Sequence, residues 1–209
     1  AFIRERYQVA DDRVVMYRLR VGSIPVPGLG PQWLTATQAK MLDGLDPRRL
    51  LSLARARRRA YAMSEAFVPT PGDVTYPPGA VTGADRQDWL TNGGHRDAFR
   101  HAYWNALMAR DLGQAWAEQF ATAHEAKPGN QGDFEAMDLY NNSVGRRIAA
   151  EHPGASDAEL AHLVNEALKR GELIVLDENG NLQWSDRVRF WQHGLSDQVP
   201  GEGGRPVPD

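Results

Sequence analysis

One stretch of the chain, residues 92–146, constrains the fold more than any other. It reads NGGHRDAFRHAYWNALMARDLGQAWAEQFATAHEAKPGNQGDFEAMDLYNNSVGR. Polar side chains able to do chemistry recur along it at intervals of four residues, among alanines and aromatic residues. Residues four apart lie on one face of a helix, and a buried polar atom without a partner costs about 1–3 kcal/mol. The stretch therefore predicts three packed helices whose polar faces meet water, a ligand or one another.

The first of these helices is predicted over residues 94–112. Asp97, His101 and Asn105 are spaced i, i+4 and i+8 on it, so they share one face, which Arg100 borders. Small side chains on this helix would let a neighbouring helix approach closely. They are Ala98, Ala102, Ala106 and Ala109.

The second helix is predicted over residues 114–126. It ends in the pair His124 and Glu125, just before the sequence Lys-Pro-Gly that stops it. The dipole at a helix C-terminus favours a protonated histidine, whereas a metal ion requires the neutral imidazole. The pair is therefore a candidate either for acid–base chemistry or for metal binding.

The third helix is predicted over residues 133–151. Asp138 and Asn142 lie four residues apart on it, beside an apolar stripe. Asn141 and Asn142 stand together in mid-helix and Gly145 follows, although asparagine and glycine are poor helix formers there. Breaks in local sequence rules are often found at functional sites. The third helix is therefore predicted to contribute to the same site as the first two.

The whole chain predicts a mainly α fold: a helical bundle with a small C-terminal β-hairpin and an extended N-terminal arm. Asp46 followed by Pro47 is a favourable helix start, and Ser156 with Glu159 forms a capping box for a later helix. Residues 173–176 and 181–184 flank a turn that contains Asn-Gly, and together they predict a β-hairpin.

Three parts are expected along the chain. Residues 1–30 form an N-terminal extended arm and linker, residues 31–193 a helical catalytic domain with the hairpin, and residues 194–209 a flexible tail rich in glycine and proline. Residues 68–84 form a long loop before the central stretch, which suits either a lid or a surface connector.

Composition narrows the chemistry. The chain has no cysteine, which excludes disulfides, thiolate nucleophiles and cysteine-ligated zinc. Its formal net charge of −3 disfavours nucleic acid as a partner, because nucleic-acid binding usually needs a basic excess. No apolar run approaches the roughly 18 residues of a membrane helix. A monomer is expected.

If the three helices pack as an antiparallel bundle, their polar groups converge. Catalysis is then predicted to involve Arg100, His101, His124, Glu125 and Asp138. The last four are also the predicted ligands of a divalent metal ion (Zn, Mn, Mg or Ca), which would activate a water molecule. Arg100 would steady a developing negative charge. Substrate binding is predicted for Asp97, Asn105, Asn141 and Asn142.

Metal-free alternatives stay open at this point. Glu125 would serve as the general acid of a muramidase-like peptidoglycan glycosidase if burial raised its pKa. His101 with Asp97 or Asp138 would form a general-base pair. A buried polar network that only ties the three helices together is the structural alternative for the same residues.

Three segments, DAFRHAYWNALMAR, AHE and MDLYNNSVGRRIA, begin at Asp97, Ala123 and Met137. In this order they resemble a bacterial domain family of unknown function that occurs in secreted, wall-associated and polymorphic-toxin-like proteins. The resemblance covers about residues 92–150 and implies an exported protein or antibacterial effector acting on the cell envelope. The order of His101, His124, Glu125 and Asp138 also loosely resembles helical metal-dependent phosphohydrolases, with Glu125 in place of their aspartate.

These inferences together favour an envelope-targeting, toxin-like hydrolase that cleaves a phosphoester in a phospholipid or lipid-linked cell-wall precursor with the help of a metal. The glycosidase is the second hypothesis, and a non-enzymatic binding or pore-forming toxin domain is the third. The resemblance implies secretion or delivery to the periplasm of a target cell, and an immunity protein as a further partner. The start at Ala1 without a methionine is expected of a processed product or of a domain from a longer protein.

Overall fold

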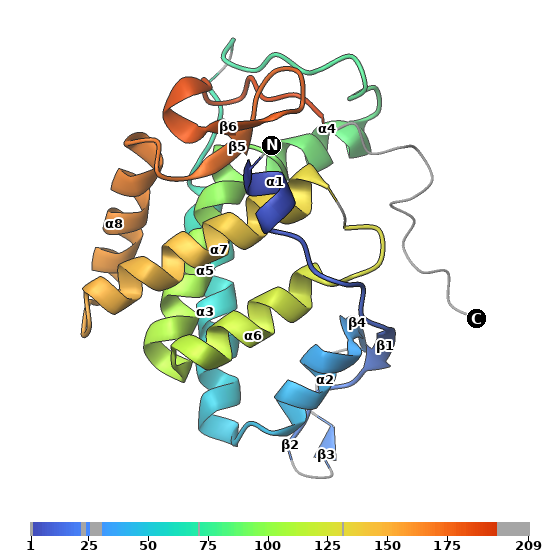
Figure 1. The fold of residues 1–209 in the computed structure, drawn as a ribbon, viewed down its shortest axis with the longest axis vertical. Coiled ribbons are helices and arrows are strands. Elements are labelled where there is room, and N and C mark those ends of the chain that lie inside the picture. Colours follow the sequence, from blue (N-terminus) through green and yellow to red (C-terminus); the bar gives the residue numbers. More distant parts are fainter. Residues whose placement is uncertain (1, 22–23, 26–30, 71, 131, 196–209) are drawn as a thin grey trace.

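The fold is known from a computed structural model, which describes residues 2–21, 24–25, 31–70, 72–130 and 132–195 (Figure 1). The helices among these residues are α1 (Phe2–Arg6), α2 (Ala36–Asp43), α3 (Pro47–Glu65), α4 (Gly83–Thr91), α5 (His95–Leu112), α6 (Gln114–Glu125), α7 (Asp133–Glu151), α8 (Asp157–Lys169) and a 3-10 turn η1 (Ser185–Arg187). The strands are β1 (Val14–Tyr17), β2 (Arg20–Val21), β3 (Ile24–Pro25), β4 (Gln32–Thr35), β5 (Ile174–Leu176) and β6 (Leu182–Trp184). They form three antiparallel pairs, β1–β4, β2–β3 and β5–β6.

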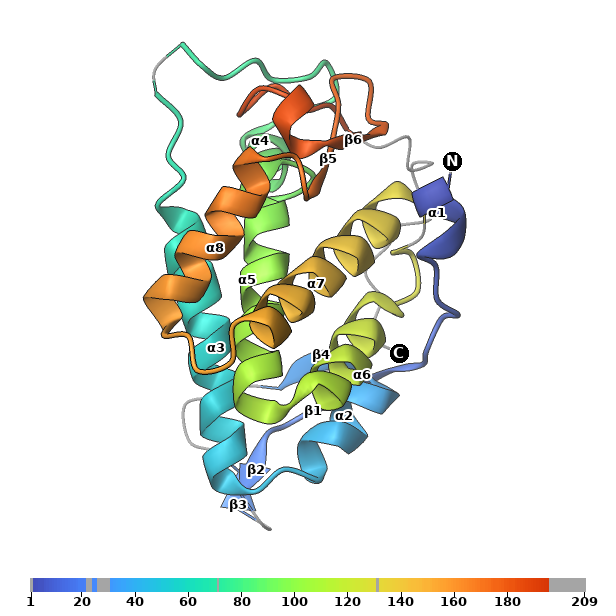
Figure 2. The ribbon, with the colours of Figure 1, turned by 60° about the vertical axis from the view of Figure 1, so that its left-hand side comes forward.

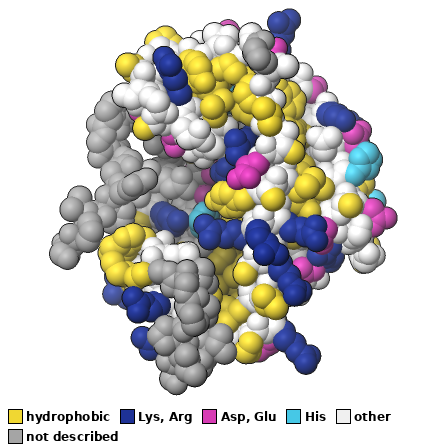
Figure 3. Space-filling model, turned by 180° about the vertical axis from the view of Figure 1, so that it is seen from behind, with side chains coloured by type: hydrophobic (Ala, Val, Ile, Leu, Met, Phe, Trp, Pro, Cys, Tyr) yellow, Lys and Arg dark blue, Asp and Glu magenta, His cyan; other side chains and the backbone are white. Residues whose placement is uncertain are grey.

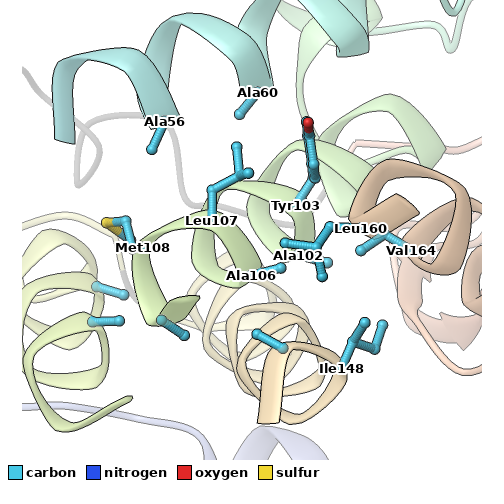
Figure 4. Packing of buried hydrophobic residues seen from close by; sticks show 14 of the residues in the cluster. Ala56, Ala60, Ala102, Tyr103, Ala106, Leu107, Met108, Ile148, Leu160 and Val164 are labelled. Carbon is cyan, nitrogen blue, oxygen red and sulfur yellow. The ribbon is translucent and has the colours of Figure 1, made fainter. Parts of the chain in front are cut away.

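Helix α5 lies at the centre of the fold, and α3, α6, α7 and α8 pack around it (Figure 2). Its side chains divide between these neighbours (Figure 4). Tyr103 and Leu107 face the small residues of α3, and Ala102 and Ala106 face α7 and α8. All four side chains are almost fully buried. The predicted mainly α fold with a small C-terminal hairpin is therefore confirmed, and the predicted first helix is its core.

Gly145 explains how closely α7 approaches α5. A Cβ atom at this position would lie 1.9 Å from the carbonyl oxygen of Ala102, so any larger residue would push the two helices apart. The glycine that weakens α7 locally is thus required by packing. The same approach brings the polar face of α7 against that of α5.

The predicted helix signals are present in the structure. Asp46 accepts hydrogen bonds from the backbone N–H groups of Arg48 and Arg49, and Ser156 and Glu159 form the capping box of α8. The hairpin β5–β6 is tied to α7 by Asn141. Its side chain exchanges two hydrogen bonds, of 2.8 and 2.9 Å, with the backbone of Ile174.

Two helices were not predicted. Helix α4 begins inside the segment expected to be loop, where Thr82 and Asp85 form a capping box and Trp89 supplies a buried anchor. Helix α1 lies in the segment expected to be extended, because Ile3 packs against the apolar cluster that contains Met137. Both rest on tertiary contacts that local sequence does not reveal.

The expected division into arm, catalytic domain and tail stays a prediction. Residues 26–30 of the linker and residues 196–209 of the tail lie outside the described residues. Among the residues that are described, no helix combines the length and apolarity needed to cross a lipid bilayer.

Candidate functional site

Three buried carboxyl groups surround the imidazole of His101 where α5, α6 and α7 meet. On one side, His101 Nε2 lies 3.4 Å from Asp97 Oδ1 and 3.6 Å from Asp138 Oδ1. On the other side, His101 Nδ1 lies 3.6 Å from Glu125 Oε1. All four residues are buried, with exposed fractions of 2–8%. We call Asp97, His101, Glu125 and Asp138 the carboxylate cluster.

Part of this cluster could hold a metal ion. One carboxylate oxygen each from Asp97 and Asp138 and one ring nitrogen of His101 lie within 4.8 Å of one another. Bonds of about 2.1 Å in a tetrahedral site place neighbouring ligand atoms about 3.4 Å apart, close to the spacings around His101 Nε2. In addition, Asp138 Oδ1 is buried without a hydrogen-bond partner among the described residues. Nitrogen and carboxylate ligands of this kind suit zinc or manganese.

The electrostatics of the carboxylate cluster show what burial does to it. Burial raises the pKa of Asp138 well above its ordinary value, and the nearby charges of Asp97 and Glu125 raise it further. Burial likewise raises the pKa of Glu125 to about 7. It lowers the pKa of His101 to about 4, so the imidazole is neutral at physiological pH. A neutral imidazole is the form that binds metals.

Asp97 is fixed in place by the turn between α4 and α5. The N–H of Gly93 donates to Asp97 Oδ2 at 2.8 Å, and Arg100 Nη2 donates to Asp97 Oδ1 at 2.5 Å. Gly93 has a φ of +79°, a conformation that favours glycine. Arg100 also donates to the carbonyl oxygen of Thr91 at 2.9 Å. This arginine therefore orients Asp97 and anchors the end of α4.

A chain of side-chain hydrogen bonds holds Glu125 opposite His101. Arg146 donates to Asn105 Oδ1 at 3.1 Å, Asn105 donates to Asn142 Oδ1 at 2.5 Å, and Asn142 donates to Glu125 Oε1 at 3.3 Å. Asn130 donates to the other oxygen, Glu125 Oε2, at 2.9 Å. Both Glu125 oxygens are thus occupied by amide donors, and one of them faces His101 Nδ1.

The structure brings most of the predicted site residues together, but not two of them. His124 does not join the carboxylate cluster. Its Nδ1 lies 3.1 Å from Gln38 Nε2, and its ring packs edge-on against Trp104. Asn141 faces β5 instead of the site. Adjacent residues on a helix point about 100° apart, so His124 cannot face the same way as Glu125, nor Asn141 the same way as Asn142.

The sequence reasoning missed Asn130 and gave Asp97 a different role. Asn130 follows the Lys-Pro-Gly stop of α6, where an asparagine is an ordinary loop residue and carries no signal of its own. Asp97 was predicted to bind substrate, whereas the geometry makes it a potential metal ligand. Its spacing of four residues from His101 was the available signal.

Comparison with known proteins gives a family but no activity. A family model described as a domain of unknown function (DUF6973) matches residues 45–172, more than half of the chain. The match contains the whole carboxylate cluster and the asparagines that support it. No curated protein and no solved structure matches the chain. The chain belongs to the DUF6973 family of domains of unknown function.

Proposed function

We propose that this domain is a metal-assisted hydrolase of phosphoesters, with the ion held by Asp97, His101 and Asp138. The observation that carries the proposal is the geometry of these three buried side chains, which offer one ligand atom each, all within 4.8 Å of one another. His101 Nε2 faces the two aspartates, which leaves Nδ1 for a supporting contact.

Charge balance supports a divalent ion. The site contains three carboxyl groups, on Asp97, Glu125 and Asp138, and one adjacent guanidinium, on Arg100. If all are ionised, two negative charges are left unbalanced in a buried position, which is costly. Protonation relieves this cost in the metal-free protein, in agreement with the raised pKa values of Asp138 and Glu125. A divalent ion would relieve it without protons.

The surroundings of His101 resemble those of histidines that bind metal ions. A ligating imidazole commonly offers its second nitrogen to a carboxylate, which fixes the ring. Glu125 lies in that position and is itself held by Asn130 and Asn142. A bound ion would lower the pKa of a water ligand to about 7 and polarise a phosphoryl oxygen. Arg100, which donates hydrogen bonds to Thr91, Asn92 and Asp97, would add positive charge beside it.

A metal-free glycosidase is the second candidate, because one observation favours it. Burial raises the pKa of Glu125 to about 7, and a general acid needs such a value to be protonated at neutral pH. Secretion, action on the cell envelope as an antibacterial toxin, and an immunity partner are wider proposals that rest on the resemblance to proteins of toxin systems.

Metal-dependent hydrolysis tests the leading proposal. Chelator-stripped protein would be assayed on bis(p-nitrophenyl) phosphate after addition of Zn²⁺, Mn²⁺, Mg²⁺ or Ca²⁺. We expect hydrolysis only with metal, its loss in Asp138→Asn, and its retention in Asp133→Asn, a matched change on the same helix outside the cluster. Hydrolysis that chelators leave unchanged, or none with any of the four ions, would overturn the proposal. Peptidoglycan cleavage that resists chelators and disappears in Glu125→Gln would establish the glycosidase instead.

A further inference from the structure

A mostly apolar groove of about 620 Å³ lies beside the carboxylate cluster. This volume is typical of ligand sites, which span about 300–1,000 Å³. Helix α3 contributes Leu50 and Leu53 to it, and β4 contributes Leu34. Trp104 of α5 and Phe120 of α6 also line it. Tyr17 of β1 and Leu42 of α2 line it as well, so the groove is built by strands and helices from several parts of the fold.

The rim of the groove is positively charged. Of the described residues, Arg57, Arg58 and Lys127 line it, against a single acidic residue, Glu65. None of the three cations forms an ion pair with a carboxylate among the described residues. Seen from behind, the molecule has Lys and Arg side chains gathered across the middle of its surface, with hydrophobic side chains between them (Figure 3). An apolar channel with unpaired cations at its edge is complementary to an amphiphile with an anionic head.

The charged rim leads to the carboxylate cluster. Tyr61 lines the groove, and its ring centroid lies 5.5 Å from Arg57 Cζ and 5.3 Å from Arg100 Cζ. Arg100 in turn binds Asp97. His124 also lines the groove and precedes Glu125 in α6. An anionic group held at Arg57 is thus one aromatic ring away from Arg100, which binds Asp97 of the carboxylate cluster.

We infer that this groove binds the acyl chain of an anionic lipid and that Arg57, Arg58 and Lys127 bind its phosphate. Hydrolysis of the bound lipid rests on the proposed function, because the lipid would carry the phosphoester that the carboxylate cluster cleaves. His124 would then form part of the groove wall, between the acyl chain of the lipid and the carboxylate cluster. Lipid binding itself needs no metal.

Alkyl phosphates test the binding. Octyl, decyl and dodecyl phosphate would be titrated calorimetrically below their micellar concentrations into metal-free protein, with inorganic phosphate and decyltrimethylammonium as comparators. Burial of methylenes predicts that affinity increases about fourfold per methylene. We expect neither comparator to bind. Equal binding of the cationic amphiphile, or no dependence on chain length, would overturn the inference.

Two variants locate the binding on this surface. Arg57→Glu with Arg58→Glu should weaken decyl phosphate binding at least about tenfold, since it reverses two charges on the exposed face of α3. Arg55→Glu is the matched control, because Arg55 is exposed on the same helix but does not line the groove. Ala54→Trp should fill the groove and block the chain. Equal weakening by the control would show that only general charge attraction is involved.

The failure of this inference can be told apart from the failure of the proposed function. Protein that binds alkyl phosphates but hydrolyses no phosphoester with any added metal would keep the groove assignment and remove the hydrolase. Protein that hydrolyses bis(p-nitrophenyl) phosphate with metal but binds no alkyl phosphate would do the opposite. In that case a peptide or a second copy of the chain would be sought as the occupant of the groove.

Discussion

Two buried histidine clusters in this protein differ in the partners of their rings. In the carboxylate cluster, His101 is surrounded by three carboxyl groups. In the other, His95 stacks on Phe190 with ring centroids 4.0 Å apart, and His193 stacks on Trp89 at 4.3 Å. We call Trp89, His95, Phe190 and His193 the aromatic cluster. Its histidines are as deeply buried as His101.

The hydrogen bonds of the aromatic cluster are made with the backbone. His95 Nε2 bonds the carbonyl oxygen of Ser185 at 2.8 Å, and His193 Nε2 lies 3.0 Å from that of Trp89. Trp89 Nε1 donates to the carbonyl oxygen of His193 at 2.8 Å. These bonds fasten the C-terminal segment to α4 and α5 and involve no carboxylate. Burial is therefore common to both clusters, and the carboxyl groups around His101 are what distinguishes them.

The largest difference between the clusters should appear in metal binding. We expect His101→Gln and Asp138→Asn to abolish the binding of Mn²⁺ or Zn²⁺, because each removes one of three ligands. His95→Gln and His193→Gln should keep it while lowering the free energy of unfolding by about 1–3 kcal/mol through lost buried hydrogen bonds. Calorimetric titration and urea unfolding would measure the two effects. Loss of metal binding in His95→Gln equal to that in His101→Gln would erase the distinction.

A packing change should damage one cluster and spare the other. Gly145→Ala should lower the free energy of unfolding by about 3 kcal/mol, because its Cβ would meet the backbone of Ala102. The separation of α7 from α5 should also weaken metal binding. The ring NMR signals of His95 and His193 in the aromatic cluster should stay native-like under conditions where the variant is folded. Gly83→Ala, which meets no atom within 4 Å, is the control and should be nearly neutral.

Two neighbouring asparagines allow a finer separation. Asn142→Ala should weaken metal binding about 10–100-fold, because it removes the support of Glu125 behind His101. Asn141→Ala should leave metal affinity unchanged and lower the free energy of unfolding by about 1–3 kcal/mol, because it frees the buried backbone of Ile174. If both variants had the same effect on metal affinity, the proposed orientation of α7 would be contradicted.

Glu125 of the carboxylate cluster and His95 of the aromatic cluster should respond to acid with opposite signs in metal-free protein, which is the smallest effect. Glu125 has its pKa raised from 4.5 to about 7, so the folded state holds a proton that the unfolded chain loses, and stability increases as pH falls from 7 to 4.5. His95 has its pKa lowered from 6.5 to about 4, so stability is lost as pH falls from 6.5 to 4.

Melting temperatures at pH 7.5 and pH 5 would show this contrast. The melting temperature of Glu125→Gln, relative to that of the wild type, should be lower at pH 5 than at pH 7.5. The relative melting temperature of His95→Gln should be higher at pH 5 than at pH 7.5. All samples would contain a chelator, so that no ion changes the charge of the site. A shift of the same sign in both variants would contradict the assigned environments.

Much of the fold could be predicted from the sequence because its signals are local. The spacing of apolar and small residues and the Lys-Pro-Gly stop defined the helices found as α5, α6 and α7. Capping residues defined the starts of α3 and α8. Helices α1 and α4 are short, and the contacts of Ile3 and Trp89 that hold them are made with residues distant in the sequence. Local patterns do not contain such contacts.

The residues of the candidate site could be predicted from the sequence, but the directions in which their side chains point could not. The four-residue spacing of Asp97 and His101 placed them on one face, and the structure agrees. Which member of the pair His124 and Glu125 faces inward depends on the rotation of α6 about its axis, and this is set by packing against α5 and α7. The apolar groove joins residues from β4, α3, α5 and α6, so no single segment of the sequence could reveal it.

The location of a bound ion tests the central claim most directly. Crystals grown with Mn²⁺ would be used for anomalous diffraction above the manganese absorption edge. We expect one peak about 2.0–2.2 Å from Asp97 Oδ1, His101 Nε2 and Asp138 Oδ1, with Glu125 behind the imidazole. A fully occupied ion elsewhere in the molecule, or no peak between these three side chains, would contradict it.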